Sequence, residues 1–263
     1  MQTVHAAESG ISIHLAPEIL GHFFGIPITN TLITVWFVMF LIVTFLVLFH
    51  SRISLVPQKT QVILEMLIGG AYDAVASALQ DERIARRFFP LIMTIFLFIL
   101  AINWVGLLPG VDAFGFYQNT HGVQKLVPFL HPGNTDLNIT LGFTIVAFFT
   151  IELAGIAYLG FMKYASKFIN VKMFRQFNTK NVMGFFIGII ELFSEIARLI
   201  SFSFRLFGNI FAGKTLILVA LFFAPFILPV PLLAFELFVG LIQAFIFAVL
   251  TLFFIKLAIE EPH

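Results

Sequence analysis

The chain has 263 residues, of which 60% are hydrophobic and 11% charged, and its formal net charge is +1. Together with a mean hydropathy of +1.02, this composition excludes a soluble globular protein, and the near-neutral charge excludes a nucleic-acid partner. The 36 phenylalanines and the absence of cysteine fit a lipid-facing surface built without disulfides. We therefore expect an all-α integral membrane protein that forms a single membrane domain over residues 1–263.

Three apolar runs have the length of a simple membrane span. Residues 1–30 contain no Lys or Arg and are predicted to form an external tail before the first span. About 20 apolar helical residues cross a bilayer core, and the runs 31–50, 88–108 and 137–162 meet this length. Between the first two runs, residues 57–87 mix apolar and charged side chains, which predicts an amphipathic helix at the membrane interface rather than a soluble domain.

Two further apolar runs are too long for an upright span. At 1.5 Å per residue, residues 182–223 would form a helix of about 60 Å and residues 231–259 one of about 43 Å, against a hydrocarbon thickness of roughly 30 Å. Such lengths require strong tilt, a kink or a portion lying along the interface. Pro225, Pro229 and Pro231 mark the turn between the two runs. We predict five spans, the last two long and strongly tilted.

The distribution of Lys and Arg orients these spans. The loop 109–136 contains one Lys, whereas the loop 163–181 contains five Lys and Arg and no acid, and the segment between the first two spans is also basic. Basic loops stay in the cytoplasm. The prediction is an N-terminus outside the cell, an external loop 109–136, a cytoplasmic loop 163–181 and a cytoplasmic C-terminus.

Ionisable side chains gather in the last two spans. Arg205 stands out, because an arginine keeps its charge and costs about 2.5–3.5 kcal/mol or more at membrane depth. At 100° per residue, a polar stripe of about 120° on the fourth span contains Glu191, Ser194, Glu195, Arg198, Ser201, Arg205 and Asn209. One face of the fifth span contains Glu236, Gly240, Gln243 and Phe247.

The predicted topology sorts these groups by depth. Glu191 and Glu195 lie toward the cytoplasm, Arg205 and Gln243 lie near the middle, and Glu236 lies in the outer half. Two offset polar zones, one open to each side of the membrane, would therefore meet near Arg205. A single continuous pore would not need that offset.

Structural roles compete with functional ones for several of these charges. Glu195, Arg198 and Lys214 are equally compatible with either, and Lys214 could form an ion pair with Glu236. A structural role is favoured for Glu152. Lys256 is expected to extend to the inner headgroups.

A second motif points to a different chemistry. GNIFAGKT, residues 208–215, matches the phosphate-binding pattern G-x-x-x-x-G-K-[ST]. That pattern works as a loop with free backbone N–H groups, whereas here it lies inside an apolar run whose helical donors are already used. The seven histidines have no metal-ligand spacing, and no nucleophile–base pair is apparent. We expect no bound nucleotide, metal or cofactor and no nucleotide chemistry in this chain.

The motifs of the last two spans resemble a known family. RLFGN at residues 205–209, QAFIF at residues 243–247 and HFFGIPITNTL at residues 22–32 are similar to subunit a of the membrane (Fo) sector of bacterial F-type ATP synthases. The interfacial helix and the five spans are similar as well, so the resemblance covers nearly the whole chain. It implies a non-catalytic stator subunit in the bacterial inner membrane. The implied partners are the c-subunit ring, b-type peripheral stalk subunits and, indirectly, the catalytic head.

The resemblance also implies roles for individual residues. Arg205 matches the family's essential arginine, which faces the ion-carrying carboxylate of the ring. Asn209, Gln243 and Glu191 match positions associated with the aqueous half-channels, and Ser201 lies on the same stripe. Where the enteric-bacterial pattern has an acid nine residues after the arginine, this chain has Lys214. Where that pattern has a histidine seven residues before the glutamine, it has Glu236. The exchange suggests that the acid of the outer half-channel has moved to the fifth span.

Two other functions are compatible with a polar membrane bundle. A secondary transporter or channel of another class would show inverted repeats and broken helices in its two halves, and the sequence shows neither. A membrane ATPase would use GNIFAGKT to bind nucleotide. The transported ion could be H⁺ or Na⁺. Protons are favoured, because Glu191, Glu195 and Glu236 supply titratable groups on both sides.

Overall fold

The computed structural model describes residues 17–54, 57–108, 110–111, 114–120, 123–168, 179–225 and 227–260. Within these residues the fold consists of seven α-helices, one 3-10 turn and two small antiparallel hairpins. In chain order the elements are β1 (Ile19–Phe23), β2 (Ile26–Thr29), α1 (Asn30–His50), α2 (Lys59–Leu79), α3 (Glu82–Val105), β3 (Gly115–Thr120), β4 (Val123–Pro128), η2 (Gly133–Thr135), α4 (Leu137–Leu159), α5 (Phe161–Phe168), α7 (Thr179–Phe223) and α8 (Pro229–Ile259). The predicted helical membrane fold, with two long final helices, is confirmed.

Short-range capping sets where the helices begin and end. The side chain of Asp81 accepts hydrogen bonds from the backbone N–H groups of Arg83 and Ile84 and so starts α3. Gln80, with a φ of 57°, ends α2 just before this cap. The stretch predicted as one interfacial helix over residues 57–87 therefore divides, and its basic C-terminal part belongs to α3. Gly160, with a positive φ of 81° that favours glycine, ends α4 and separates it from α5.

In the part of the chain that the structure describes, six helices are long and apolar enough to cross a membrane, and α2 is one of them. Placing α2 across the bilayer would put Lys59 and the arginines at the start of α3 on opposite sides. The positive-inside rule disfavours that arrangement. The interfacial position of α2 and the count of five spans therefore stay predictions.

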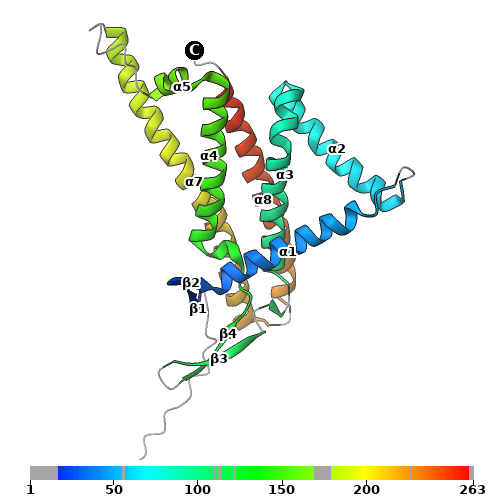
Figure 1. Cartoon of the computed structure of the whole chain (residues 1–263). Helices are drawn as coiled ribbons and strands as arrows, with labels where there is room; N and C mark the ends of the chain where they lie inside the picture. The colour runs from blue at the N-terminus through cyan, green and yellow to red at the C-terminus, as the bar shows by residue number, and fades with distance from the viewer. Residues whose placement is uncertain are drawn as a thin grey trace, which may run out of the picture.

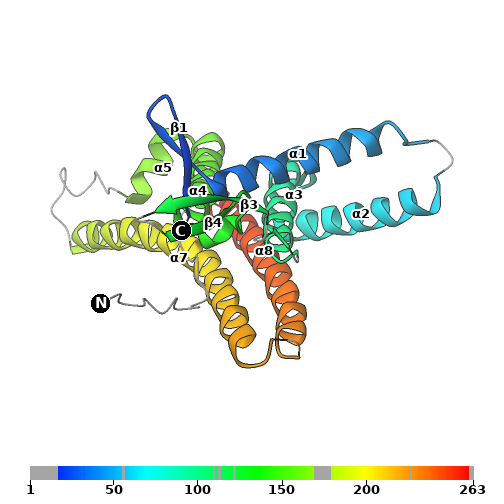
Figure 2. The ribbon, with the colours of Figure 1, turned by 90° about the horizontal axis from the view of Figure 1, so that it is seen from below.

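The helices form a bundle with a projecting arm. In Figure 1, α3, α4 and α8 run side by side, α7 leans across them, and α1 and α2 extend to the right as a V; Figure 2 shows the same arm from below. Helix α8 contacts α3, α4 and α7 and is the central element. Strands β3 and β4 lie at the end of the bundle where α8 begins, and we call this the hairpin end.

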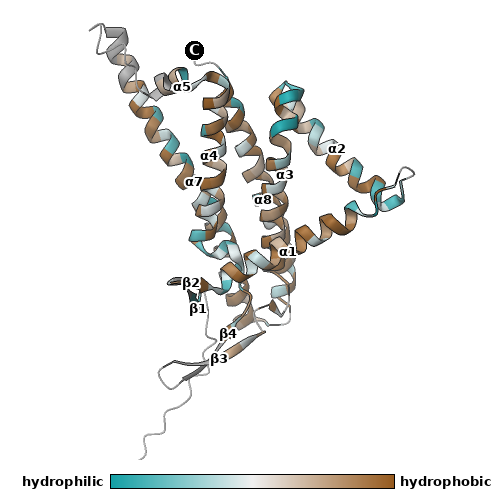
Figure 3. Cartoon of the chain, in the orientation of Figure 1, coloured by the Kyte–Doolittle hydropathy of each residue, from teal (hydrophilic) through white to brown (hydrophobic). Residues whose placement is uncertain are grey.

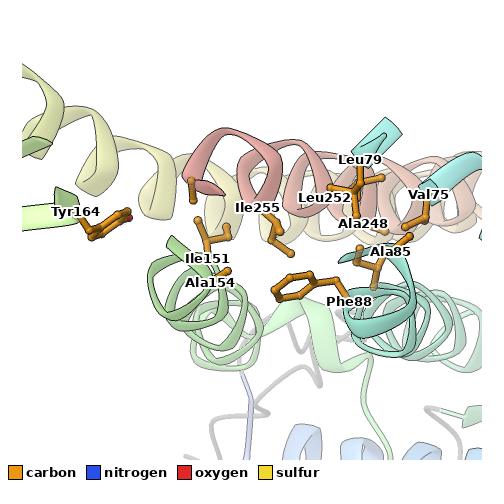
Figure 4. Packing of buried hydrophobic residues seen from close by; sticks show 12 residues of the cluster. Val75, Leu79, Ala85, Phe88, Ile151, Ala154, Tyr164, Ala248, Leu252 and Ile255 are labelled. Atoms are coloured by element: carbon orange, nitrogen blue, oxygen red, sulfur yellow. The ribbon is translucent and has the colours of Figure 1, made fainter. Parts of the chain in front are cut away.

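Apolar side chains join the bundle in two clusters. The first draws residues from five helices, namely α2, α3, α4, α5 and α8, and Figure 4 shows Phe88 and Ile255 within it. The second packs α7 against the others, with Ile99, Leu206 and Ala244 among its buried members. Helix surfaces that face away from these clusters are also largely hydrophobic, as Figure 3 shows. The packing fixes α7 and α8 side by side, and such an apolar exterior suits lipid.

Buried polar contacts close the hairpin end. The Oγ1 of Thr31 donates to Asp136 Oδ2 at 2.8 Å, and the backbone N–H of His131 donates to Thr34 Oγ1 at 2.9 Å. Asp136 also caps the start of α4 through the N–H of Asn138. These bonds tie the start of α1 to the segment before α4, so that segment is held against the ends of α3 and α7.

Candidate functional site: two cavities along the α7–α8 pair

Helices α7 and α8 line two cavities and, between them, a narrow gap, so their contact has three successive levels. Because the two helices are antiparallel, residues early in α8 lie at the level of residues late in α7. The level nearest the hairpin end contains a cavity of about 400 Å³, lined by parts of α3, α7, α8 and the segment around Pro132. It is called here the Glu236 cavity. Its polar lining side chains are Asn103, Lys214 and Glu236.

Glu236 is buried between α7 and α8. Only 3% of its surface is exposed, and a Cβ placed on Gly213 would overlap its carboxylate. The carboxylate therefore lies directly against the backbone of α7, where a side chain larger than hydrogen cannot fit. Its Oε1 atom is buried and accepts no hydrogen bond from the residues that the structure describes. A buried acceptor of this kind normally has a water or another donor beside it.

Lys214 contacts a histidine that the sequence did not single out. Its Nζ lies 3.2 Å from Nδ1 of His131, whereas the sequence had left open an ion pair between this lysine and Glu236. His131 is almost fully buried, with 1% of its surface exposed. The contact joins α7 to the segment before η2, 83 residues away in the chain.

Two amides and an indole hold α8 at this level. Asn134 donates from Nδ2 to Asn103 Oδ1 at 2.6 Å, and Asn103 donates from Nδ2 to the Gly240 carbonyl at 3.0 Å. The indole Nε1 of Trp104 donates to the Leu237 carbonyl at 3.2 Å. These bonds attach the end of α3 to the middle of α8, next to Glu236.

Arg205 lies at the middle level. Its Nη2 donates to Ser201 Oγ one turn earlier at 3.3 Å, and Gln243 faces it across a gap of only about 10 Å³. Phe202 and Phe247 close this gap, with ring centroids 5.3 Å apart. A space of this size holds roughly one water molecule at most. The middle level is therefore the narrowest part of the contact between α7 and α8, which is called here the α7–α8 seam.

The third level contains a cavity of about 310 Å³, called here the Arg198 cavity. It is lined by α7 and α8 alone, and Arg205 and Phe202 line both this cavity and the gap. The guanidinium of Arg198 lies over the Phe254 ring, 3.8 Å from its centroid. Its Nη1 lies 2.6 Å from Glu195 Oε2. The Arg198 side chain is thus fixed by an ion pair and a cation–π contact.

Glu195 lies on the bundle side of α7, away from the exposed part of the stripe. Only 4% of its surface is exposed, and it lies close enough to Tyr164 of α5 to affect that phenol electrostatically. The Tyr164 hydroxyl donates to Glu152 Oε2 at 2.9 Å. Burial, followed by this hydrogen bond, raises the pKa of Tyr164 far above its ordinary value. The phenol therefore remains a donor at physiological pH.

The rest of the stripe faces outward. Ser194, Ser201 and Asn209 are exposed on α7, and the same helix exposes large apolar side chains, among them Phe186, Ile190, Phe193, Ile196 and Phe204. Glu191 is half-buried beside them. This outward surface of polar and large apolar side chains reaches Arg205. It is the α7 surface on which a second membrane subunit could pack.

The structure groups the residues singled out from the sequence differently from the helical projection. Arg205, Ser201 and Gln243 come together at the middle level, and Glu236 and Lys214 share one cavity. Glu195 separates from them and pairs with Arg198 on the bundle side of α7. The sequence analysis overlooked Asn103, His131, Asn134 and Tyr164. Asn103 could have been found as a lone asparagine within an apolar run. His131 and Asn134 could have been found from the polar segment LHPGNTD at residues 130–136.

Comparison with known proteins decides the family. The family model described as "ATP synthase A chain" matches residues 32–256. The chain belongs to this family, the a subunits of the Fo sector. Membership makes it a non-catalytic, multi-pass membrane subunit, and it displaces the alternative of a transporter of another class. The motif GNIFAGKT lies wholly within α7, so its backbone N–H groups are engaged in helical bonds, and this displaces the ATPase alternative.

Relatives in the family align along most of their length. ATP synthase subunit a of Moorella thermoacetica is 28% identical over 242 residues, covering 92% of this chain and 96% of the relative. The protein from Desulfosudis oleivorans is 33% identical over 234 residues, covering 88% and 89%. A relative from Propionigenium modestum, described as sodium ion specific, is 29% identical over 258 residues, covering 94% and 80%. The likeness thus extends over the α7–α8 seam.

Proposed function

We propose that this chain is the stator half of a rotary proton pathway, in which two offset half-channels meet at Arg205. The observation that carries the proposal is the order of cavities along the α7–α8 seam. A cavity of about 400 Å³ surrounds Glu236, one of about 310 Å³ surrounds Arg198, and the gap at Arg205 measures about 10 Å³. Arg205 lines the Arg198 cavity and the gap, so an ion in either cavity would find no wide passage past the arginine.

The charge of Arg205 supports its role as a barrier. An arginine about 4 Å from a carboxylate, at an effective dielectric near 20, favours the ionised carboxylate by about 4 kcal/mol. A ring carboxylate that came to face Arg205 would release its proton about a thousandfold more readily. It would bind another proton only after moving away. Since each charge crossing the membrane carries about 2.3 kcal/mol per 100 mV, a direct leak would dissipate the driving force.

The outward face of α7 supports a ring of c subunits as the partner. Ser201 and Asn209 are exposed on it beside large apolar side chains, and a moving partner carrying buried carboxylates fits such a surface. The family role adds b-type stalk subunits and, through them, the catalytic head.

The orientation follows from the basic loops. The hairpin end, with the Glu236 cavity, would face outside a bacterial inner membrane, and the Arg198 cavity would face the cytoplasm. Glu236 would then serve the outer half-channel and Glu191 the inner one. Gln243 would complete the barrier level beside Arg205.

The proposal is tested by replacing Arg205 with alanine in the complete ATP synthase, reconstituted in vesicles. Arg205→Ala should assemble normally and lose proton-driven ATP synthesis by at least about a hundredfold, because the transition between half-channels loses its fixed charge. Arg86→Ala is the matched control, since Arg86 is exposed on α3 and should leave synthesis unchanged. Normal proton-driven synthesis by assembled Arg205→Ala would overturn the proposed function.

A further inference from the structure

A cavity at the tip of the projecting arm lies apart from the ion path. Helices α1 and α2 meet at this tip and diverge from it (Figure 1), and the cavity between the end of α1 and the start of α2 measures about 460 Å³. It is called here the tip cavity. Its described lining residues all belong to α1, α2 and the segment between them. Sites for small ligands have volumes of roughly 300–1,000 Å³, so the tip cavity has the size of a binding site.

One part of the tip cavity is apolar and comes from both helices. Phe45 and Phe49 line it from α1, with their rings stacked and the ring centroids 6.2 Å apart. Ile63 and Leu64 line it from α2. Hydrocarbon chains would gain from contact with these side chains, whereas a free inorganic ion would not.

The other part of the tip cavity is polar, and its base is fixed by Gln61. This side chain is buried. Its Oε1 accepts the backbone N–H of Ser54 at 3.2 Å, and its Nε2 donates to the Ser54 carbonyl at 3.2 Å and to Glu65 Oε1 at 2.7 Å. Gln61 thereby holds the segment after α1 against α2, so the cavity keeps its shape without a ligand. Gln58 and Thr60 supply further polar groups to the lining.

Arg52 gives the tip cavity its charge. Among the described residues that line the cavity, Arg52 is the one charged side chain. It is exposed and forms no ion pair with a carboxylate in the described part of the chain. A guanidinium binds phosphate through two parallel hydrogen bonds. The polar part therefore suits an anionic phosphate group, and the apolar part suits hydrocarbon attached to it.

A second cavity shows what the apolar part adds. It also measures about 460 Å³, and it is lined at the start of α3 by Glu82, Arg83, Arg86 and Arg87. All of its described lining side chains are charged, so it offers hydrocarbon nothing to pack against. Water and mobile counterions suit such a surface. The tip cavity differs because it joins one cation to an apolar wall.

The orientation proposed above places the tip cavity at the inner leaflet. It follows α1, the first span, in a segment that contains Arg52 and Lys59, and basic segments stay on the cytoplasmic side. Anionic phospholipids of the cytoplasmic leaflet attract basic residues next to a membrane span. The ligand class that fits the lining is therefore present at that depth.

We propose that the tip cavity binds one anionic phospholipid, with its phosphate on Arg52 and its acyl chains against the phenylalanines of α1 and Ile63 of α2. Gln58 and Thr60 would bind the hydroxyl and ester oxygens of the headgroup region. The lipid would fill the wedge between the two helices and so support the angle of the arm. This inference shares the orientation of the proposed function and none of its ion path.

The experiment labels the site with a photoreactive lipid. The complete ATP synthase is placed in phosphatidylcholine vesicles with about 20% phosphatidylglycerol, some of which carries a photoreactive group on an acyl chain close to the glycerol. Cross-links on residues 45–49 are counted by mass spectrometry after illumination. Arg52→Gln should reduce them about fivefold or more, and Arg52→Lys should retain about half, because it keeps the charge but not the paired hydrogen bonds. Arg86→Gln, in the wholly charged cavity, is the matched control and should label like the wild type.

A second pair of variants tests the apolar part. Ile63→Ser should reduce the cross-links on α1 about threefold. Met66→Ser is its control, because Met66 is similarly exposed on α2, at 67% against 54% for Ile63, but does not line the cavity. Both side chains are exposed, so neither change should disturb folding. Equal labelling of the two serine variants would refute a bound lipid.

Three further results would overturn the proposal. Wild-type labelling in Arg52→Gln, or an equal loss in Arg86→Gln, would show only a general attraction between the lipid and basic residues. Displacement of the label by inorganic phosphate would assign the cavity to a free anion. Absence of label in the wild type would show that another subunit covers the tip. All of these results are independent of Arg205→Ala, which tests the proposed function separately.

Discussion

The Glu236 cavity and the Arg198 cavity lie on the same helix pair but are built differently. Parts of α3, α7, α8 and the segment around Pro132 line the Glu236 cavity. Asn103 stabilises that wall by donating a hydrogen bond to the Gly240 carbonyl and accepting one from Asn134. Only α7 and α8 line the Arg198 cavity, and the adjacent Ser194 and Ser201 are exposed. The first cavity has walls from four parts of the chain. The second has an open side on the outward face of α7, where a partner subunit would close it.

This difference bears on the proposed function, in which a partner ring moves past the chain. A path walled mainly by one subunit would keep its geometry while the partner turns, so its chemistry would depend on its own residues. A path completed by the partner changes as each new subunit arrives. Substitutions in the Glu236 cavity should therefore act on proton access, whereas substitutions in the Glu195–Arg198 ion pair beside the Arg198 cavity should act first on stability and assembly.

The largest effect is expected from Gly213→Ala. The added Cβ would overlap the Glu236 carboxylate, so the carboxylate must move or α7 and α8 must separate. Proton-driven synthesis in reconstituted vesicles should fall about as far as in Glu236→Gln, roughly tenfold or more. Gly142→Ala is the control, because a Cβ there meets nothing within 4 Å. Equal activity of both alanine variants would show that the carboxylate position does not matter.

A smaller effect is expected from Glu195→Gln in the ion pair beside the Arg198 cavity. Removing one partner of a buried pair costs about 3–5 kcal/mol, and partial exposure of Arg198, at 18%, should reduce this to roughly 2 kcal/mol. Thermal unfolding of the purified complex measures the loss. Glu260→Gln breaks a more exposed pair with Lys256 and should change stability by less than about 1 kcal/mol. A larger loss from Glu260→Gln would reverse this ranking.

The smallest effect is expected from Tyr164→Phe. The ring would still fill the space beside Gly155, and only the hydrogen bond to Glu152 would be lost, at about 1 kcal/mol. Burial raises the pKa of Tyr164 above its ordinary value of 10.0. Its neutral form therefore stabilises the fold below that pH, and the stabilisation declines as the pH rises further. Stability measured against pH should show a weaker alkaline decline in Tyr164→Phe, and an identical decline would contradict this assignment.

Much of the fold followed from local signals. The apolar runs predicted the long helices, and their excess length predicts that α7 and α8 are tilted in the membrane. The proline cluster at residues 225–231 marked the turn between them. The end of α2 at Leu79 was missed, because one capping contact at Asp81 outweighed the continuous charge pattern around it.

The depth of a site residue along its helix was predictable, whereas the direction in which it faces around the helix was much less so. Depth followed from counting residues, so Arg205 and Gln243 were correctly expected at one level. A stripe of about 120° cannot separate neighbours that lie 100° apart, and Glu195 was grouped with residues that face the other way. The contact between His131 and Lys214 joins segments 83 residues apart, which no periodicity reports.

The bonds from the end of α3 to α8 have a consequence for tuning the seam. Asn103 and Trp104 donate hydrogen bonds to the carbonyls of Gly240 and Leu237, which lie one turn apart on α8. The two bonds together fix the axial position of α8 relative to α3. Sliding α8 by one turn would displace it by about 5.4 Å and carry Gln243 away from Arg205. The alignment of Arg205 with Gln243, which the proposed barrier needs, is therefore set from a helix that does not line the gap. Natural variation at the end of α3 would be one place to look for synthases that leak.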